Sequence, residues 1–137
     1  MKTVSKTNHN SENSEAEKFA KWLRLHGYYS THIANESGLP KKIAMFSMIR
    51  KKRMGLSQWF PDYMIVLKRG SLLFIELKKR RSIKKNGEYS AYSTDSIDIS
   101  PEQVAWIDKL DEIDNVGAFF AFWAEEAKAI VRREEIK

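Results

Sequence analysis

Two short apolar segments separated by a four-residue turn constrain the fold of this chain more than any other feature. Both segments, residues 62–67 and 72–78, consist mainly of apolar side chains over a length typical of a strand. Lys68-Arg69-Gly70-Ser71 between them supplies the glycine and polar residues of a tight turn. The sequence therefore predicts a β-hairpin whose open end lies at residues 62 and 78.

The second strand of this hairpin carries an acid inside its apolar run. Side chains alternate along a strand, so Leu73 and Leu77 should face one side of the sheet, and Glu76 and Lys78 the other. A carboxylate in an apolar strand is costly unless it is paired or bound to a cation. Glu76 therefore either forms an ion pair with Lys78 or Lys68 on a solvated face, or takes part in a functional site.

Helical and strand patterns flank the hairpin on both sides. Ser14 with Glu17 three residues later is typical of a helix start, and Gly27 of a helix end. Ser100-Pro101-Glu102-Gln103 predicts a further start, with Gln103 as a capping side chain. The 137 residues fit one α/β domain, with a mixed central sheet and helices on both faces. We expect helices at residues 14–26, 43–54, 100–113 and 125–135, and further strands at 28–33 and 116–123.

Composition excludes several classes of protein. Residues 1–13 are polar and are expected to form a flexible tail before a folded domain of residues 14–137. The absence of cysteine excludes disulfides and thiolate metal sites, and the three histidines have no zinc-like spacing. No segment approaches the ~20 apolar residues of a membrane span, and the N-terminus lacks the apolar core of a signal peptide. We expect a cytoplasmic protein with no membrane association and no small-molecule cofactor.

Charge is concentrated in the middle of the chain. The segment from Lys41 to Lys85 holds fourteen basic residues and two acidic ones, Asp62 and Glu76, whereas the remainder holds ten basic and sixteen acidic residues. A strongly basic middle inside an acidic frame indicates a polyanionic partner. The nucleic-acid contacts would come from two basic runs, namely Arg50, Lys51, Lys52 and Arg53, and Lys79, Arg80, Arg81, Lys84 and Lys85.

The hairpin brings together residue types suited to phosphodiester hydrolysis. That reaction needs a bound divalent cation, stabilisation of the charged transition state and a positioned water. Asp62 would lie at the start of the first strand, and Glu76 near the end of its partner. Lys78 shares the face of Glu76 because strand periodicity is two. Two carboxylates and a backbone carbonyl can hold Mg²⁺, and a nearby lysine can orient or deprotonate water.

These residues resemble the signature of the PD-(D/E)XK nuclease superfamily, and the surrounding motifs resemble its VRR-NUC branch. The similarity covers about residues 14 to 131, and its pieces occur in the family's order along the chain. They are Ser14-Glu15, His32-Ile33-Ala34-Asn35, Phe60-Pro61-Asp62, Phe74-Ile75-Glu76-Leu77-Lys78 and Ser100-Pro101-Glu102-Gln103. The resemblance implies a restriction-endonuclease-like fold and a metal-dependent endonuclease acting on DNA. Stand-alone relatives are often homodimers that act on branched DNA, which suggests a junction-resolving endonuclease.

The resemblance also assigns roles to individual residues. It implies that Asp62, Glu76 and the carbonyl of Leu77 bind Mg²⁺ or Mn²⁺. Lys78 would be the water-activating base or an electrostatic helper.

Two further residues would complete the site by the same resemblance. Gln103 would sit beside it, and a glutamate of the first helix would complete it. We favour Glu15 over Glu17 for that role, because Glu15 falls at the edge of the apolar helical face and Glu17 opposite it.

Each assignment has a simpler alternative. Asp62 could be a turn residue beside proline, and Lys78 could merely begin a basic run. Glu15 could only favour the helix dipole, and Gln103 could serve only as a cap. His32 is interpreted as structural. The alternative for the whole chain is a non-catalytic nucleic-acid-binding module or interaction protein on a nuclease scaffold.

Overall fold

The elements of the fold follow one another in the predicted order. A computed structural model describes residues 12–33, 41–55, 57, 59–78 and 99–137. The first eleven residues of the predicted tail lie outside this part of the chain, and so do residues 34–40, 56, 58 and 79–98. The elements are α1 (Glu12–Leu25), β1 (Tyr29–His32), α2 (Lys41–Arg53), β2 (Tyr63–Val66), β3 (Leu72–Leu77), α3 (Pro101–Asp111), β4 (Val116–Ala121) and α4 (Ala124–Glu135).

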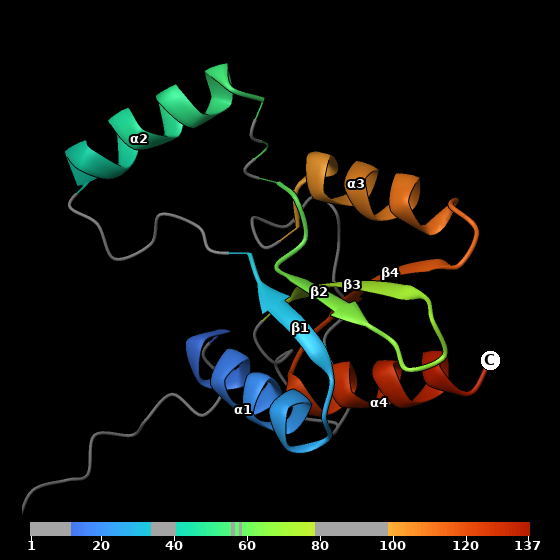
Figure 1. The fold of residues 1–137 in the computed structure, drawn as a ribbon. Coiled ribbons are helices and arrows are strands. Elements are labelled where there is room, and N and C mark those ends of the chain that lie inside the picture. The colour runs from blue at the N-terminus through green and yellow to red at the C-terminus, as the bar shows by residue number, and fades with distance from the viewer. Residues whose placement is uncertain (1–11, 34–40, 56, 58, 79–98) are drawn as a thin grey trace, which may run out of the picture.

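The four strands form one mixed sheet in the order β1-β2-β3-β4 (Figure 1). β2 and β3 form the predicted hairpin, in which Tyr63 lies opposite Ile75. The turn is closed by the Leu67 N–H, which donates to the Ser71 carbonyl at 2.8 Å, and Gly70 has a φ of +89°. β1 adds to the hairpin antiparallel, whereas β4 lies parallel to β3 after the crossover through α3. The prediction of a mixed sheet is confirmed.

Helices cover both faces of this sheet, as predicted. Figure 1 shows α1 and α4 on one face and α3 on the other. The alternation of β3 decides which side chains meet which helix. Leu73, Ile75 and Leu77 lie in the larger core with α1 and α4, while Phe74 packs with Ile107 of α3.

The start of the first helix was predicted wrongly. α1 begins at Glu12, so Ser14 lies inside the helix and is not its cap. Glu12 and Asn13 therefore belong to the helix and not to the tail. The predicted end is confirmed, since the helix stops at Leu25 and Gly27 has a φ of +75°.

The capping box of α3 forms as predicted. The Ser100 hydroxyl accepts from the Gln103 N–H at 3.1 Å, and the Gln103 side-chain oxygen accepts from the Ser100 N–H at 3.0 Å. This box closes the first turn of α3. In the described residues, no helix combines the length and the apolar character needed to cross a membrane.

Candidate metal and phosphodiesterase site

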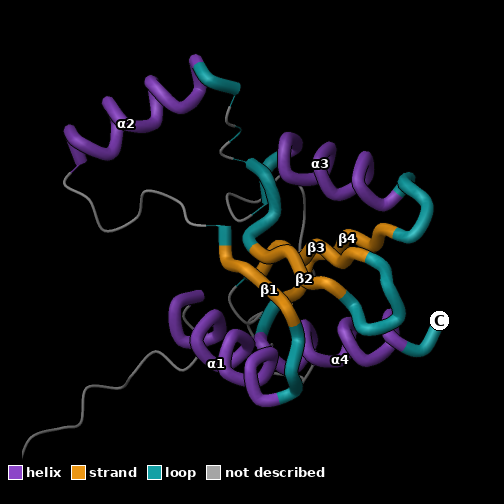
Figure 2. Tube along the Cα trace, viewed as in Figure 1, coloured by secondary structure: helices purple, strands orange, loops and turns teal. Residues whose placement is uncertain are grey.

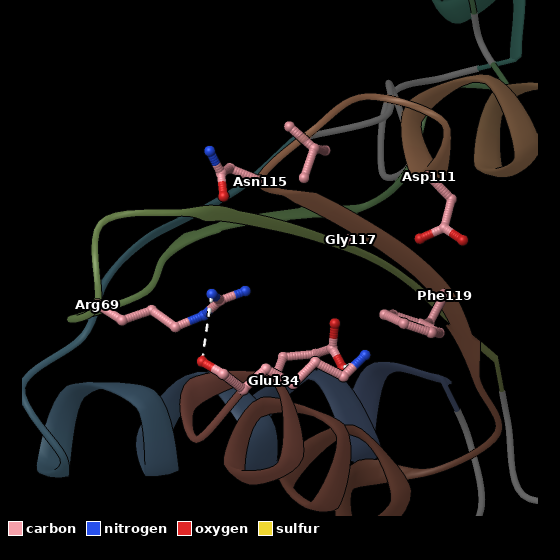
Figure 3. Close-up of a pocket in the computed structure, with 8 residues that line it drawn as sticks. Arg69, Asp111, Asn115, Gly117, Phe119 and Glu134 are labelled. Atoms are coloured by element: carbon pink, nitrogen blue, oxygen red, sulfur yellow. Dashed lines mark hydrogen bonds and ion pairs between the residues drawn. The ribbon is translucent and has the colours of Figure 1, made fainter.

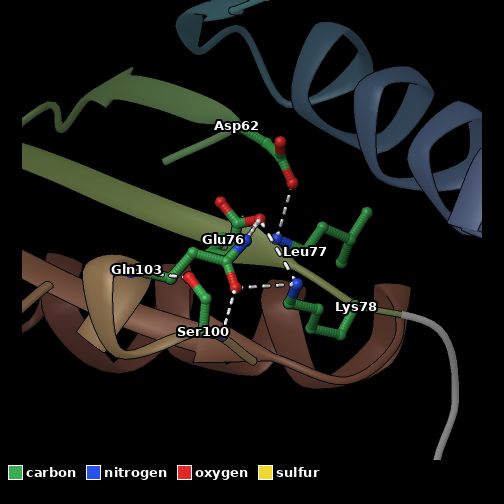
Figure 4. Close-up of polar contacts among 6 residues, drawn as sticks. All are labelled: Asp62, Glu76, Leu77, Lys78, Ser100 and Gln103. Carbon is green, nitrogen blue, oxygen red and sulfur yellow. Dashed lines mark hydrogen bonds and ion pairs between the residues drawn. The ribbon is translucent and has the colours of Figure 1, made fainter. Parts of the chain in front are cut away.

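Four polar side chains gather at the open end of the hairpin. Asp62 immediately precedes β2, Glu76 and Lys78 lie at the end of β3, and Gln103 comes from the first turn of α3 (Figure 4). The hairpin pairing brings the first three together, and the crossover through α3 adds the fourth. The sequence placed a site at this end of the sheet, and the structure brings these four residues into contact there.

Asp62 is oriented by the backbone of the partner strand. Its Oδ2 accepts the Leu77 N–H at 3.1 Å. Burial raises the pKa of the Asp62 carboxyl above its usual value, although the hydrogen bond from Leu77, the charges of His32 and Lys78 and a hydrogen bond with Glu76 act to lower it. A carboxyl in this position ionises at a cost, which a bound cation would offset.

The partners of Glu76 include the amide of Gln103 and the ammonium group of Lys78. It is 6% exposed, and its Oε1 accepts from Gln103 Nε2 at 3.0 Å. Lys78 Nζ lies 3.7 Å from the same oxygen. The ion pair of Glu76 with Lys78 is therefore present, but both residues are buried and do not lie on the solvated face that the simpler alternative assumed.

Gln103 has both of the roles that the sequence left open, because it caps α3 and also contacts the residues of the cluster. Its side-chain oxygen accepts from Lys78 Nζ at 3.2 Å as well as from the Ser100 N–H. Its Nε2 donates to Glu76. The capping box thus fixes the rotamer of a side chain that in turn orients Glu76 and Lys78.

The Leu77 carbonyl faces the Asp62 side of β3. The N–H and C=O of one residue in an antiparallel ladder point to the same neighbouring strand, and the Leu77 N–H points to Asp62. Within the described residues, no group of three or more His, Asp or Glu side chains is placed to hold a metal. Two carboxylates and one carbonyl are nevertheless a donor set that suits Mg²⁺, which usually keeps several waters.

Glu15 has a different set of contacts. It is 3% exposed, and its Oε2 accepts the Ala124 N–H at 2.8 Å, at the start of α4. Its Oε1 lies 3.7 Å from Lys18 Nζ. Glu17 is exposed, as its helical face predicted. Glu15 therefore acts as a cap for α4 and stands apart from the hydrogen-bonded cluster in the part of the chain described.

His32 lies next to Asp62, which the sequence did not predict. It ends β1 opposite Tyr63, and the ring centroids of His32 and Tyr63 are 4.8 Å apart. The next residue, Ile33, donates its N–H to the Asp62 carbonyl at 2.6 Å. The charge of His32 lowers the pKa of Asp62 more than that of Lys78 does. Only the pairing of β1 with β2 reveals this neighbour.

The segment before Asp62 is anchored to α3 by aromatic rings. Phe60 packs edge-on against Trp106, with ring centroids 4.9 Å apart, and against Phe74. Trp106 Nε1 donates to the Ser57 hydroxyl at 2.9 Å. These contacts fix the direction in which the chain enters the cluster.

The predicted nucleic-acid residues are only partly described. Arg50, Lys51, Lys52 and Arg53 form the last turn of α2, as predicted. The second group, Lys79, Arg80, Arg81, Lys84 and Lys85, lies outside the described residues.

Comparison with known proteins shows a similarity in fold. The sequence matches no family model and no curated protein. A solved structure described as a "VRR_NUC domain protein" superposes with a TM-score of 0.61 at 20% sequence identity. The match covers 98% of this chain and 90% of that one. The chain therefore has a VRR-NUC-like fold of the restriction-endonuclease type.

Proposed function

We propose that this chain is a metal-dependent endonuclease that hydrolyses phosphodiester bonds of DNA. The observation that carries the proposal is the cluster of Asp62, Glu76, Lys78 and Gln103 at the open end of the hairpin. The VRR-NUC-like fold supports it. The excess of basic residues around the cluster supports a polyanionic substrate.

Asp62, Glu76 and the Leu77 carbonyl would hold Mg²⁺ or Mn²⁺. When bound, such an ion stabilises the charge that develops on the phosphate and lowers the pKa of a bound water. The Leu77 N–H keeps the Asp62 carboxylate oriented, and Gln103 keeps that of Glu76 oriented. Both carboxylates are thereby positioned before substrate binds, which reduces the cost of ordering them.

Lys78 would act on the water or on the phosphate. Its ammonium group is 3.2 Å from the Gln103 oxygen and faces the Glu76 carboxylate. From there the ammonium can orient the attacking water or place positive charge beside the phosphate, and the neutral amine form can accept the proton of that water. Water attacks the phosphorus directly, and the departing 3′ or 5′ oxygen takes a proton from solvent.

The wider features of the proposal rest on charge and on the family resemblance. The basic runs Arg50 to Arg53 and Lys79 to Lys85 would bind the DNA backbone on either side of the cluster. A branched substrate, a homodimeric assembly and Glu15 as an additional site residue follow from the resemblance. No small-molecule cofactor is invoked.

A cleavage panel tests the proposal. Supercoiled plasmid and labelled single-stranded, duplex, flap and four-way DNA, with an RNA of the same sequence, are incubated with Mg²⁺, Mn²⁺ or Ca²⁺. We expect nicked or cut DNA with Mg²⁺ or Mn²⁺ and none in the presence of a chelator. Asp62→Ala should abolish cleavage and leave DNA binding intact.

Two results would contradict the assignment. One is cleavage that persists in both Asp62→Ala and Glu76→Ala, which would indicate a contaminating nuclease. The other is the absence of cleavage of every substrate by a folded wild-type protein.

A non-catalytic nucleic-acid-binding module is the second candidate. The ion pair of Glu76 with Lys78 favours it, because this pair already provides the buried carboxylate with a cation. On that account Asp62→Ala and Glu76→Ala would alter only stability, and DNA binding would not respond to divalent cations.

A further inference from the structure

Among the described helices, α2 exposes the most large apolar side chains. Figure 2 shows it standing apart from the sheet and from the other helices, and no other described element forms a packing interface with it. Its middle carries four exposed apolar residues. They are Ile43 (55% exposed), Met45 (54%), Phe46 (66%) and Ile49 (44%).

These four side chains lie on one broad face between two charged ends. At ~100° per residue they span an arc of about 160° of the helix surface. Lys42 at one end and Arg50 and Arg53 at the other fall within the same arc. The face is therefore apolar in its centre and cationic at both ends, a pattern suited to a partner with apolar surfaces between phosphates.

The charge of α2 favours a nucleic acid over a second copy of this chain as its binding partner. Its thirteen residues include six Lys or Arg and no acid. Pairing with the same helix of a second copy would bring twelve positive charges together, which disfavours that arrangement. A nucleic acid satisfies both parts of the face, since its phosphates neutralise the cations and its unstacked bases accept apolar side chains.

The chain segments before and after α2 both connect to residues beside the candidate metal site. The chain leaves β1 at Ile33, passes through α2 and returns at Asp62, and these two residues share a backbone hydrogen bond of 2.6 Å. The returning segment is fixed to α3 through Ser57 and Phe60. Both ends of α2 are therefore joined through short stretches of chain to residues at the Asp62–Glu76 cluster.

We propose that α2 is a DNA-binding arm that inserts Phe46, flanked by Met45 and Ile49, between bases beside the phosphate that is cut. This inference rests on the proposed function. Inserting an apolar side chain requires unstacking, which costs least where a helix branches or ends. The arm would thus confer preference for branched DNA over continuous duplex.

The test measures binding without cleavage, in an Asp62→Ala background. The probes are a fluorescein-labelled four-way junction and a linear duplex of the same arm sequence. A second junction carries 2-aminopurine at the branch point, whose fluorescence rises when the base unstacks. Phe46→Ala is compared with Tyr29→Ala, an apolar residue that is 83% exposed on β1, away from the arm.

We expect Phe46→Ala to weaken junction binding about 10-fold or more and to leave duplex binding unchanged. The 2-aminopurine signal should rise with the Asp62→Ala parent and with Tyr29→Ala, and stay quenched with Phe46→Ala. Arg50→Gln with Arg53→Gln should weaken both DNAs and lower the salt slope by about 1.8. Because Phe46 is exposed, the unfolding temperature should not change.

Three results would overturn the proposal. The first is junction affinity that is equal in Phe46→Ala and Tyr29→Ala. The second is a sedimentation change from dimer to monomer in Phe46→Ala with equal losses for both DNAs, which would make α2 a protein interface. The third is Phe46-dependent binding to anionic phospholipid vesicles without any to DNA. A wild-type protein that binds junctions through Phe46 and cuts nothing would remove the nuclease proposal alone.

Discussion

Two buried glutamates lie at opposite ends of the sheet, and their surroundings differ in charge. Glu134 of α4 is 4% exposed and borders a surface pocket of about 400 Å³ at the hairpin-turn end (Figure 3). Its Oε2 lies 2.7 Å from Lys137 Nζ and 3.4 Å from Arg133 Nε. Glu76, which is 6% exposed, has one buried lysine and a second carboxyl, Asp62, beside it.

The comparison separates a single acid held by exposed cations from two acids that lie side by side. Glu134 has two cations for one carboxylate, and both cations reach solvent. In the described part of the chain, Asp62 and Glu76 lie together beside the buried Lys78, and burial raises the pKa of Asp62. A buried glutamate is therefore not by itself a sign of function. What distinguishes the open end of the hairpin is a second carboxyl beside the first, an arrangement of oxygen donors that suits a divalent cation.

The cleavage rate should show the largest difference between substitutions at the Asp62–Glu76 cluster and the substitution at Glu134. Glu76→Gln and Asp62→Asn should each lower the cleavage rate roughly 1,000-fold or more, since charge stabilisation by a bound metal is worth several kcal/mol. Glu134→Gln, which removes a buried charge of the same kind, should stay within about 2-fold of wild type. Initial rates on a single preferred substrate with Mg²⁺ provide the measurement, and similar losses at both ends would break the comparison.

Gln103 should affect activity through Glu76 and Lys78, the residues that it orients. Gln103→Ala removes the hydrogen bonds to Glu76 and Lys78 and should reduce activity roughly 10- to 100-fold, the usual effect of losing an outer partner of a metal ligand. Ser100→Ala is the matched control, because it breaks the same cap and leaves those contacts in place. Its cost should be about 1 kcal/mol of stability with activity retained. Equal activity in the two variants would show that Gln103 serves only the helix.

The raised pKa of Asp62 should make the stability of the fold depend on pH. Its pKa is raised above the usual 3.8, so the folded state loses stability as pH rises and Asp62 ionises. Asp62→Asn should therefore raise the unfolding temperature of the metal-free protein at neutral pH, and the gain should vanish below the usual pKa. Glu134→Gln should lower the unfolding temperature slightly. Thermal unfolding between pH 3 and 7.5 in chelator decides this, and a stability loss in Asp62→Asn at neutral pH would contradict it.

Glu15 should give the smallest effect of the series. Glu15→Ala removes the acceptor for the Ala124 N–H and should destabilise the fold by about 1 kcal/mol, the usual value of a helix cap. As a cap it should leave Mn²⁺ affinity unchanged. A loss of Mn²⁺ affinity comparable to that in Asp62→Asn would instead support the role that the family resemblance gives to Glu15.

Local patterns in the sequence predict most of this fold. The hairpin follows from two apolar runs and a turn, and the sides of β3 follow from alternation, so Glu76 and Lys78 share a face as expected. The capping box of α3 follows from the spacing of Ser100 and Gln103. These features depend on residues close together in the chain, where periodicity and capping chemistry decide the outcome.

Long-range contacts are what the sequence does not reveal. His32 neighbours Asp62 because of the register of β1 on β2, and Glu15 reaches an N–H 109 residues away. The same limit applies to α2, since its apolar spacing predicts a helix and does not say what covers it. Ser14 failed as a cap because α1 continues back to Glu12, which the polar sequence there does not indicate.

Binding of Mn²⁺ tests the central claim most directly, because it reads the charge of the cluster without requiring catalysis. Titration followed by electron paramagnetic resonance should show one site per chain in the wild type and in Glu134→Gln, with binding lost or weakened at least 10-fold in Asp62→Asn and in Glu76→Gln. The same affinity in all four proteins would contradict the account.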